Sequence, residues 1–299
     1  MQKYYRRCFW MLAAPAMVLF TAVVVLPFLT GVLYSFTAWR GTYFAGGKSL
    51  WESFVGLENY AKTLENEEFR AAFVNSLEYT GMTVTVVLVF SLLFALLVST
   101  VRRGAGFYRA VLFLPNLLGG LALGYIWSFL FEIIYTRWLF GGEGALFNIP
   151  FLSNMLQDHH KGIAAMAIVT AWQMTGYMMM IFVTGLNNIP SALSEAASID
   201  GCTPWQRFCH VTLPLLMPSF TIVIFLALAN CFKMLDINVA LTDGAFNTRL
   251  LAFQILRITR DFTPPDYGQA QAQAVIFFVL IAAVTLVQVS LTKKREVQL

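Results

Sequence analysis

Six stretches of the chain are long and apolar enough to cross a membrane as helices. The hydrocarbon core of a bilayer is about 30 Å thick, and a helix of roughly 20 residues spans it. The stretches that meet this requirement lie at residues 9–38, 79–100, 110–131, 162–189, 212–232 and 272–292. The pattern predicts an all-α, polytopic membrane protein with six transmembrane helices, forming one domain over residues 1–299.

The first stretch follows three basic residues, as the apolar region of a secretory signal would. It is too long for such a region, which covers about 7 to 15 residues. We therefore expect it to remain as a membrane span. Composition agrees with a membrane protein, because 58% of the residues are hydrophobic and 12% are charged. A soluble domain carries about 25% charged residues.

Other classes of site are disfavoured by the residues present. The net charge of +4 comes without a basic run interleaved with aromatics, so no nucleic-acid partner is expected. The four cysteines show no CxxC spacing. His159 and His160 are adjacent but have no third ligand nearby in the sequence, so we expect a solvated loop and no metal site. No cofactor is expected.

The positive charges predict the orientation. The connecting segments alternate between a short set and a long set along the chain. Lys and Arg outnumber the acids in the short set, while acids outnumber Lys and Arg in the long set. Because short cytoplasmic segments are enriched in positive charge, we expect both termini and segment 190–211 on the cytoplasmic side of a bacterial cell membrane.

The long outer segments contain local patterns of their own. Phe69, Phe73 and Leu77 recur at four-residue spacing, which predicts a helix lying on the outer membrane surface. The run Gly141–Gly144 predicts a loop. On the inner side, we expect Arg102, Arg103 and Arg109 mainly to anchor the topology.

Two prolines lie within predicted spans or at their edges. Pro115 and Pro214 each remove a backbone hydrogen bond if they lie in a helix interior. In a membrane, such breaks are tolerated where the freed backbone groups find other partners or line a cavity. The sequence therefore predicts kinks at both positions.

The polar segment 190–211 reads as two short helices around one break. Ser191 can cap the first helix, and Asp200-Gly201 ends it. Thr203, with Pro204 after it and Gln206 three residues on, predicts a capping box that starts the second helix.

This segment resembles a known family. Glu195-Ala196-Ala197, three residues, Gly201, nine residues, Val211, one residue and Leu213-Pro214 match the EAA signature of ABC importer permeases, with Val where Ile is usual. The resemblance extends over nearly the whole chain and is closest to the maltose and glycerol-3-phosphate class. It implies that the segment is a coupling helix docking on a separate ATPase subunit. The residues assigned to coupling are Glu195, Ala196, Ala197, Asp200, Gly201, Leu213 and Pro214.

The resemblance also implies an assembly. Such permeases work with a second, different permease chain, two copies of an ATP-binding subunit and an external solute-binding protein. A nucleotide site within this chain is not expected, because Gly47-Lys48-Ser49 lacks the Gly that a P-loop needs at position 42. The chain therefore does not read as an enzyme, and ATP hydrolysis is expected on a partner.

A polar stripe on the fourth span is the best candidate for a transport pathway. Its members fall within about 60° of one helical face. They are Thr170, Gln173, Tyr177, Thr184 and Asn188. Unpaired polar groups facing lipid are costly, so the stripe must face either other helices or a wet cavity, and both alternatives stay open. Trp172 lies off the stripe and is expected to pack.

The outer end of the fifth span carries Asn230 and Lys233 as further pathway candidates. Lys233 and Asp236 are three residues apart, so a local ion pair is an equal alternative to a role in the site. The stretch resembles sugar-type permeases, which carry a Gly-Gly-Pro turn after the Leu-Thr pair. Here Leu241-Thr242 is followed by Asp243-Gly244-Ala245, so the shape of this outer loop is an open question.

The sequence thus predicts a permease subunit that moves a sugar or oligosaccharide from an external binding protein into the cytoplasm. Alternatives are a permease for glycerol-3-phosphate or another small polar solute, an ion-coupled secondary transporter, and a scaffold subunit without a pathway. The six spans carry no ionisable residue near their centres, which disfavours ion coupling.

Overall fold

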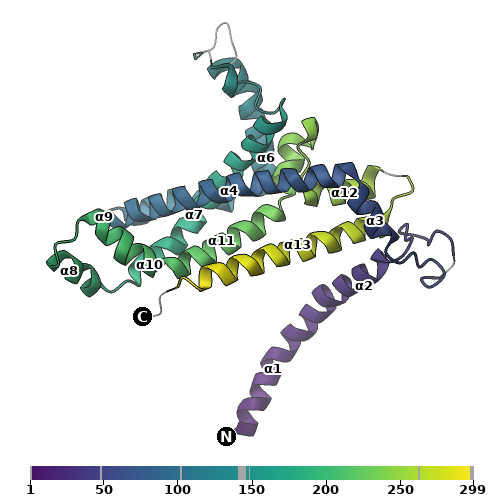
Figure 1. The fold of residues 1–299 in the computed structure, drawn as a ribbon, viewed down its shortest axis with the longest axis horizontal. Coiled ribbons are helices and arrows are strands. Elements are labelled where there is room, and N and C mark those ends of the chain that lie inside the picture. Colours follow the sequence, from purple (N-terminus) through teal and green to yellow (C-terminus); the bar gives the residue numbers. More distant parts are fainter. Residues whose placement is uncertain are drawn as a thin grey trace. The chain divides into compact units, whose positions relative to one another are not determined.

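A computed structural model describes residues 2–47, 49–101, 103–140, 146–147, 149–261 and 263–296. Within these residues the chain is helical, and its β-structure is confined to two isolated bridges, Thr37 with Phe54 and Trp39 with Phe44 (Figure 1). The all-α prediction is confirmed. Lys48, Arg102 and Gly141–Gly144, on which expectations were placed above, lie outside the described residues.

The chain divides into two compact units. The first comprises Met1–Glu67 and Ile255–Val279, and the second comprises Glu68–Gln254 and Leu280–Leu299. Within the described residues, three helices lie wholly in the first unit: α1 (Gln2–Phe20), α2 (Leu26–Ser35) and α3 (Glu58–Glu65). Helices α12 (Leu251–Asp261) and α13 (Tyr267–Lys293) are shared between the units, and α4 (Glu67–Thr100) has only its first residue in the first unit. A π-helical turn, η1 (Thr21–Val25), joins α1 to α2.

The second unit holds the remaining elements. Its α-helices are α4 (Glu67–Thr100), α5 (Ala105–Phe113), α6 (Gly120–Phe129), α7 (His159–Asn187), α8 (Ser191–Ile199), α9 (Pro204–Arg207), α10 (Leu213–Leu215) and α11 (Met217–Phe232). Its short or π-helical elements are η2 (Leu114–Leu117), η3 (Leu130–Leu139), η4 (Pro150–Leu152), η5 (Phe208–Thr212), η6 (Asn238–Thr242) and η7 (Ala245–Asn247).

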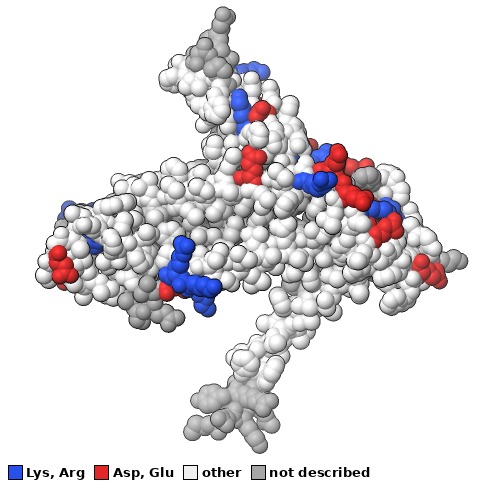
Figure 2. All heavy atoms as spheres, in the orientation of Figure 1, with Lys and Arg blue, Asp and Glu red and all other residues white. Residues whose placement is uncertain are grey.

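Among the described residues, four continuous helical segments are long and apolar enough to span a membrane, at Phe9–Ser35, Glu67–Thr100, His159–Asn187 and Tyr267–Lys293. Two further pairs of helices meet the same test together, each bent at a short break. Counting each bent pair as one span gives the six spans that the sequence predicts. On the face drawn in Figure 2, charged side chains lie at helix ends and in connecting segments, and the flanks between them carry none.

The bends occur where the prolines predict them. The pair Ala105–Leu117 and Gly120–Leu139 is bent by 93°, just after Pro115, and the pair Pro204–Leu215 and Met217–Phe232 is bent by 64°, just after Pro214. The cause is local: proline cannot donate a backbone hydrogen bond, and the backbone of Leu118 after the first proline is extended. The predicted kinks are confirmed.

The outer segment before the second span differs from expectation. The sequence predicted a separate surface helix carrying Phe69, Phe73 and Leu77, but these residues form the first turns of the 34-residue α4. Only α3 is separate, and the chain is extended at Asn66 between the two helices. No proline interrupts residues 67–100, so nothing in the sequence stops the transmembrane helix from extending outward.

In the first unit, the outer loop after α2 is held to the start of α13. The Arg40 guanidinium lies 2.7 Å from the Asp266 carboxylate, and the Gly268 amide donates to the Trp39 carbonyl at 2.9 Å. Asn59 donates to two carbonyls in residues 35–37 at 2.9 Å each. These bonds satisfy backbone groups that the loop leaves outside regular helices.

The second unit is built around α7. In the most apolar 18 residues of α7, 67% of the residues are buried, whereas in the corresponding part of α4 28% are buried. Two of its glycines permit this packing. A Cβ on Gly176 would collide with the backbone carbonyl of Leu112, and one on Gly185 would collide with the Ser219 hydroxyl. Helix α7 therefore approaches both the kinked third span and α11 closely, as small residues allow in membrane helices.

Replacement of Gly176 by alanine is expected to lower the thermal unfolding midpoint of the purified chain in detergent. The new methyl group would meet backbone atoms of Leu112, which cannot rotate away, and overpacking of this kind costs about 1–3 kcal/mol. Gly81→Ala is the matched control. Gly81 lies within α4 with open space at its Cβ position, so alanine should leave the midpoint unchanged or raise it slightly. Equal shifts in the two variants would contradict the close contact.

Candidate functional site

The segment between α7 and α11 folds as two short helices with a sharp corner. Helix α8 ends at Ile199, and Gly201 adopts a φ of 80°, a left-handed conformation that favours glycine. Helix α9 begins after Thr203. The Thr203 side chain accepts from the Gln206 amide, and the Gln206 side chain accepts from the Thr203 amide, at 3.3 and 2.9 Å. The predicted capping box is confirmed.

The start of α8 differs from expectation. Pro190 occupies the N-cap position, Ser191 is the first helical residue, and no side chain caps this end. Proline has no side-chain hydrogen-bond acceptor, so with Pro190 at the N-cap position the helix starts without a side-chain cap. Its ring fixes the backbone angle φ at which the chain enters the helix. The two short helices are tied together by Arg207, whose guanidinium donates to the Ser198 hydroxyl at 3.1 Å.

The coupling residues assigned from the sequence separate into two groups. Glu195, Ala196, Asp200 and Gly201 are exposed, whereas Ala197 is buried. Leu213 and Pro214 are half-buried in the bend that leads into α11.

The corner also exposes two large apolar side chains. Ile199 is 86% exposed and Trp205 is 71% exposed, and the Trp205 ring stacks on Phe208 with centroids 5.7 Å apart. Side chains of this size exposed on a polar corner are typical of a surface that meets another protein.

The polar stripe of the fourth span divides between buried and exposed positions. Thr170 is fully buried and accepts from the Tyr79 hydroxyl of α4 at 2.8 Å. Gln173 is half-buried and donates to the Leu118 carbonyl at 2.8 Å. That carbonyl lies at the break in the third span, where the helix no longer supplies a donor. At these two positions the stripe joins helices within the unit.

The remaining stripe residues are exposed. The Tyr177 side chain is 38% exposed, with its ring edge-on to Phe113, and Thr184 donates to the Met180 carbonyl of its own helix at 2.9 Å. Asn188 is the C-cap residue of α7. Trp172, expected to pack, is 45% exposed and meets Trp127 edge-on at 5.6 Å. An open face with a phenol, a hydroxyl and an amide thus follows the C-terminal half of α7.

After the fifth span, the local ion pair that was one of two alternatives for Lys233 and Asp236 is absent between these described residues. Helix α11 ends at Phe232, so Lys233 and Asp236 are not on one continuous helix. Both side chains are exposed. Asn230 is also exposed and donates to the Leu226 carbonyl of its own helix at 2.8 Å.

The outer loop after Leu241-Thr242 is shaped by a buried amide instead of a Gly-Gly-Pro turn. The Asn238 side chain donates to Thr242 Oγ1 at 2.9 Å and to the Thr248 carbonyl at 3.0 Å, and accepts from the Leu250 amide at 2.9 Å. Asp243 and Gly244 both adopt left-handed conformations, with φ of 46° and 69°. Sequence reasoning missed Asn238, because its role depends on contacts with residues 10 to 12 positions away.

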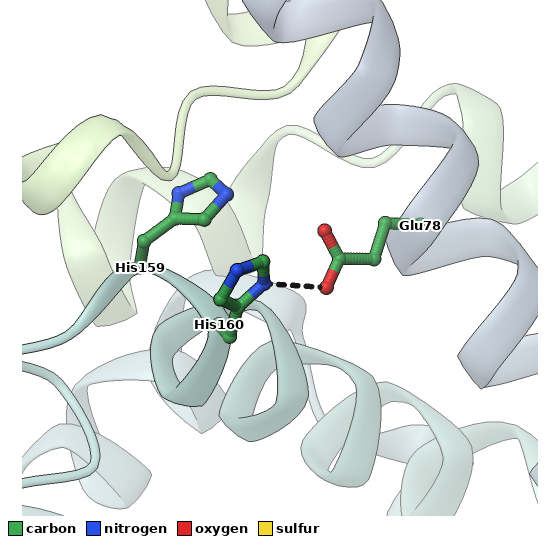
Figure 3. Close-up of side chains that lie close together, drawn as sticks. All are labelled: Glu78, His159 and His160. Carbon is green, nitrogen blue, oxygen red and sulfur yellow. Dashed lines mark hydrogen bonds and ion pairs between the residues drawn. The ribbon is translucent and has the colours of Figure 1, made fainter.

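The histidine pair before the fourth span also has an unexpected neighbour. Glu78, 81 positions before His159, comes close to both histidines at the start of α7, and its carboxylate lies 3.0 Å from His160 Nδ1 (Figure 3). Asp158 caps this helix by accepting from the Lys161 amide at 3.0 Å, and that hydrogen bond lowers the pKa of the Asp158 carboxyl. The expectation that no third ligand lies nearby is therefore wrong in three dimensions.

Comparison with known proteins gives consistent matches. The sequence profile described as "Binding-protein-dependent transport system inner membrane component" matches residues 73–297. The chain is 35% identical over 293 residues to a probable starch degradation products transport system permease protein, AmyD, of Thermoanaerobacterium thermosulfurigenes, covering 97% of this chain and 96% of that one. It is 31% identical over 289 residues to the multiple sugar-binding transport system permease protein MsmF of Streptococcus mutans, covering 96% of each chain.

A solved structure shares the fold. The match is a chain of a bacterial alginate ABC transporter in complex with an alginate pentasaccharide-bound periplasmic protein. The TM-score is 0.76 at 16% sequence identity, covering 96% of this chain and 95% of that chain.

Proposed function

The chain belongs to the family of inner membrane components of binding-protein-dependent transport systems, and from this premise we propose that it is the permease subunit of an ABC importer for a sugar or oligosaccharide. The whole chain acts as one permease domain. Its two sugar-transport relatives are matched over nearly their full lengths, which supports a carbohydrate substrate. The observation that carries the proposal is the exposed, internally capped corner at residues 190–211, which offers a protruding surface for a partner protein to bind.

The proposed assembly contains a second permease chain, two copies of an ATP-binding subunit and an external solute-binding protein. The excess of Lys and Arg in the short connecting segments supports cytoplasmic placement of both termini and of α8 and α9. The ATP-binding subunits then meet α8 and α9 from inside the cell, and the solute-binding protein delivers the sugar from outside. ATP hydrolysis takes place on the ATP-binding subunits.

In the proposed mechanism, the corner formed by α8 and α9 passes the motion of the ATP-binding subunits to the membrane helices. Thr203 and Gln206 fix the start of α9, Gly201 permits the turn, and Arg207 ties α9 to α8. Ile199 and Trp205 provide apolar area for an ATPase groove, with Glu195 and Asp200 exposed beside them. When the ATPases close, the corner moves and the bend after Pro214 passes the motion to α11. The coupling is a free-energy difference between the inward-open and outward-open states that ATPase closure biases.

The proposed pathway follows the open face of α7. Tyr177 and Thr184 provide a ring and a hydroxyl that suit the ring faces and hydroxyls of a sugar, and both are exposed in the chain alone. Gln173, Asn230 and Lys233 extend the proposed pathway toward the outer side. Thr170 is proposed to support it from behind, because it is buried against Tyr79.

The substrate class is tested by uptake. Cells that lack the chain should lose uptake of radiolabelled maltooligosaccharides, and the chain supplied in trans should restore it. Uptake should persist in the presence of an ionophore while cellular ATP is maintained. Restoration of glycerol-3-phosphate uptake alone would favour that alternative solute, and collapse with the ionophore at constant ATP would establish an ion-coupled secondary transporter.

Coupling is tested at two positions of the corner. Glu195→Lys and Gly201→Val are expected to reduce uptake more than tenfold while the chain still inserts in the membrane and ATP hydrolysis continues. Gly201→Asn is the matched control, because asparagine tolerates the left-handed conformation that valine cannot adopt without strain. It should keep most of the uptake. Wild-type uptake in both Glu195→Lys and Gly201→Val would refute the coupling role.

The pathway is tested by cysteine labelling in a background with Cys8, Cys202, Cys209 and Cys231 replaced by serine. Cysteines at Tyr177 and Thr184 should react with a water-soluble thiol reagent, and transported sugar should slow the reaction. A cysteine at Thr170 is the control and should stay unlabelled, since this position is fully buried. Absence of labelling at both exposed positions would indicate that this face packs against another helix.

A further inference from the structure

The structure brings three possible metal ligands together at the start of α7. His159 and His160 are its first two residues, and Glu78 lies on α4. One ligand atom from each side chain lies within 4.8 Å of the ligand atoms of the other two. Figure 3 shows both imidazoles and the carboxylate converging on one region from the two helices. We propose that these residues bind a divalent transition-metal ion of the zinc type, joining α4 to α7.

The chemistry of the donors suits such an ion. Two imidazoles and one carboxylate are a frequent protein set for Zn²⁺, with a water in the fourth position. Ligands about 2.0–2.1 Å from a tetrahedral ion lie roughly 3.3–3.4 Å apart. The Glu78 carboxylate and His160 Nδ1 are already 3.0 Å apart. Because the His160 side chain is 75% exposed, its ring can rotate to complete the set at little cost in packing.

The His159 ring turns one nitrogen toward the cluster. Figure 3 shows its Nε2 on the side of the Glu78 carboxylate and its Nδ1 on the opposite side of the ring, so Nε2 is the atom offered to a metal ion. Nδ1 is buried and has no hydrogen-bond partner among the described residues, and an ordered water there would satisfy it. Neither the capping of α7 nor the proposed transport pathway uses this ring.

The electrostatics permit a cation despite the helix terminus. The start of a helix carries partial positive charge, which disfavours a metal ion. Two carboxylates offset it: Glu78 contacts His160 directly, and Asp158 also acts electrostatically on the same ring. Lys161, the nearest cation in sequence, donates its ammonium hydrogen to the Ser153 carbonyl at 3.1 Å. The site therefore places two imidazole donors beside two carboxylates.

The metal would act as a cross-link between two spans. Glu78 immediately precedes Tyr79, whose hydroxyl already bonds to Thr170 of α7. An ion held by Glu78 and the two histidines would add a second link between α4 and α7, at the N-terminus of α7. This inference does not depend on transport or on the partner subunits, so its failure would leave the proposed function intact.

The test is zinc titration of the full chain, purified without a polyhistidine tag and placed in lipid nanodiscs. Calorimetry should give one Zn²⁺ per chain, and addition of Zn²⁺ should raise the thermal unfolding midpoint. Co²⁺ in place of Zn²⁺ should produce the intense visible absorption of a tetrahedral site. Glu78→Gln and His159→Ala should each weaken the apparent affinity at least tenfold, while His210→Ala should leave it unchanged.

His160→Gln provides a variant that does not threaten folding, because this side chain is largely exposed. It too should weaken zinc binding at least tenfold, with an unchanged far-UV circular dichroism spectrum. The proposal is overturned if the wild-type chain binds no Zn²⁺ at millimolar concentration, or if all three ligand variants bind it as the wild type does. Glu78 and His160 would then form an ion pair only.

Discussion

The structure depends on one constraint: a polar group within the hydrocarbon region must have a partner or face water. Helix α7 meets this constraint in two ways. Its buried polar side chains bond to groups of neighbouring helices, as Thr170 does with Tyr79 and Gln173 does with the Leu118 carbonyl. Its exposed ones, Tyr177 and Thr184, lie on the open face of the helix, where Thr184 donates to the Met180 carbonyl of its own helix.

The bend in the third span and the side chain of Gln173 are parts of one arrangement. Pro115 and the extended residues after it break the helix, and the break leaves the Leu118 carbonyl without an intrahelical donor. Gln173 provides that donor from α7, while Gly176, one turn further along, allows the Leu112 backbone to approach. A kink that would be costly in an isolated helix is thus stabilised by the neighbouring helix.

The features that the sequence predicted well are those set by neighbours along the chain. The six apolar stretches, the proline bends and the Thr203–Gln206 capping box each follow from residues a few positions apart. What it could not predict depends on residues far apart. Glu78 meets His160 across 82 positions, and Asn238 organises an outer loop through Thr248 and Leu250.

Errors at element boundaries have the same physical origin. The ion-pair alternative for Lys233 and Asp236 required a continuous helix, but α11 ends at Phe232. The expected surface helix assumed a break that no residue between 67 and 100 imposes. In both places the expectation failed at the residue where a helix begins or ends, which is the least certain part of a pattern-based prediction.

The distribution of charge explains why the energy for transport would enter through an exposed loop. The six predicted spans contain no Asp, Glu, Lys or Arg, so they offer no carboxylate, ammonium or guanidinium group to a proton or sodium ion. This composition favours an importer in which the helices themselves are moved. The corner formed by α8 and α9 is suited to that task. A capping box fixes the start of α9, a hydrogen bond joins α9 to α8, and two exposed apolar side chains can pack against a partner protein.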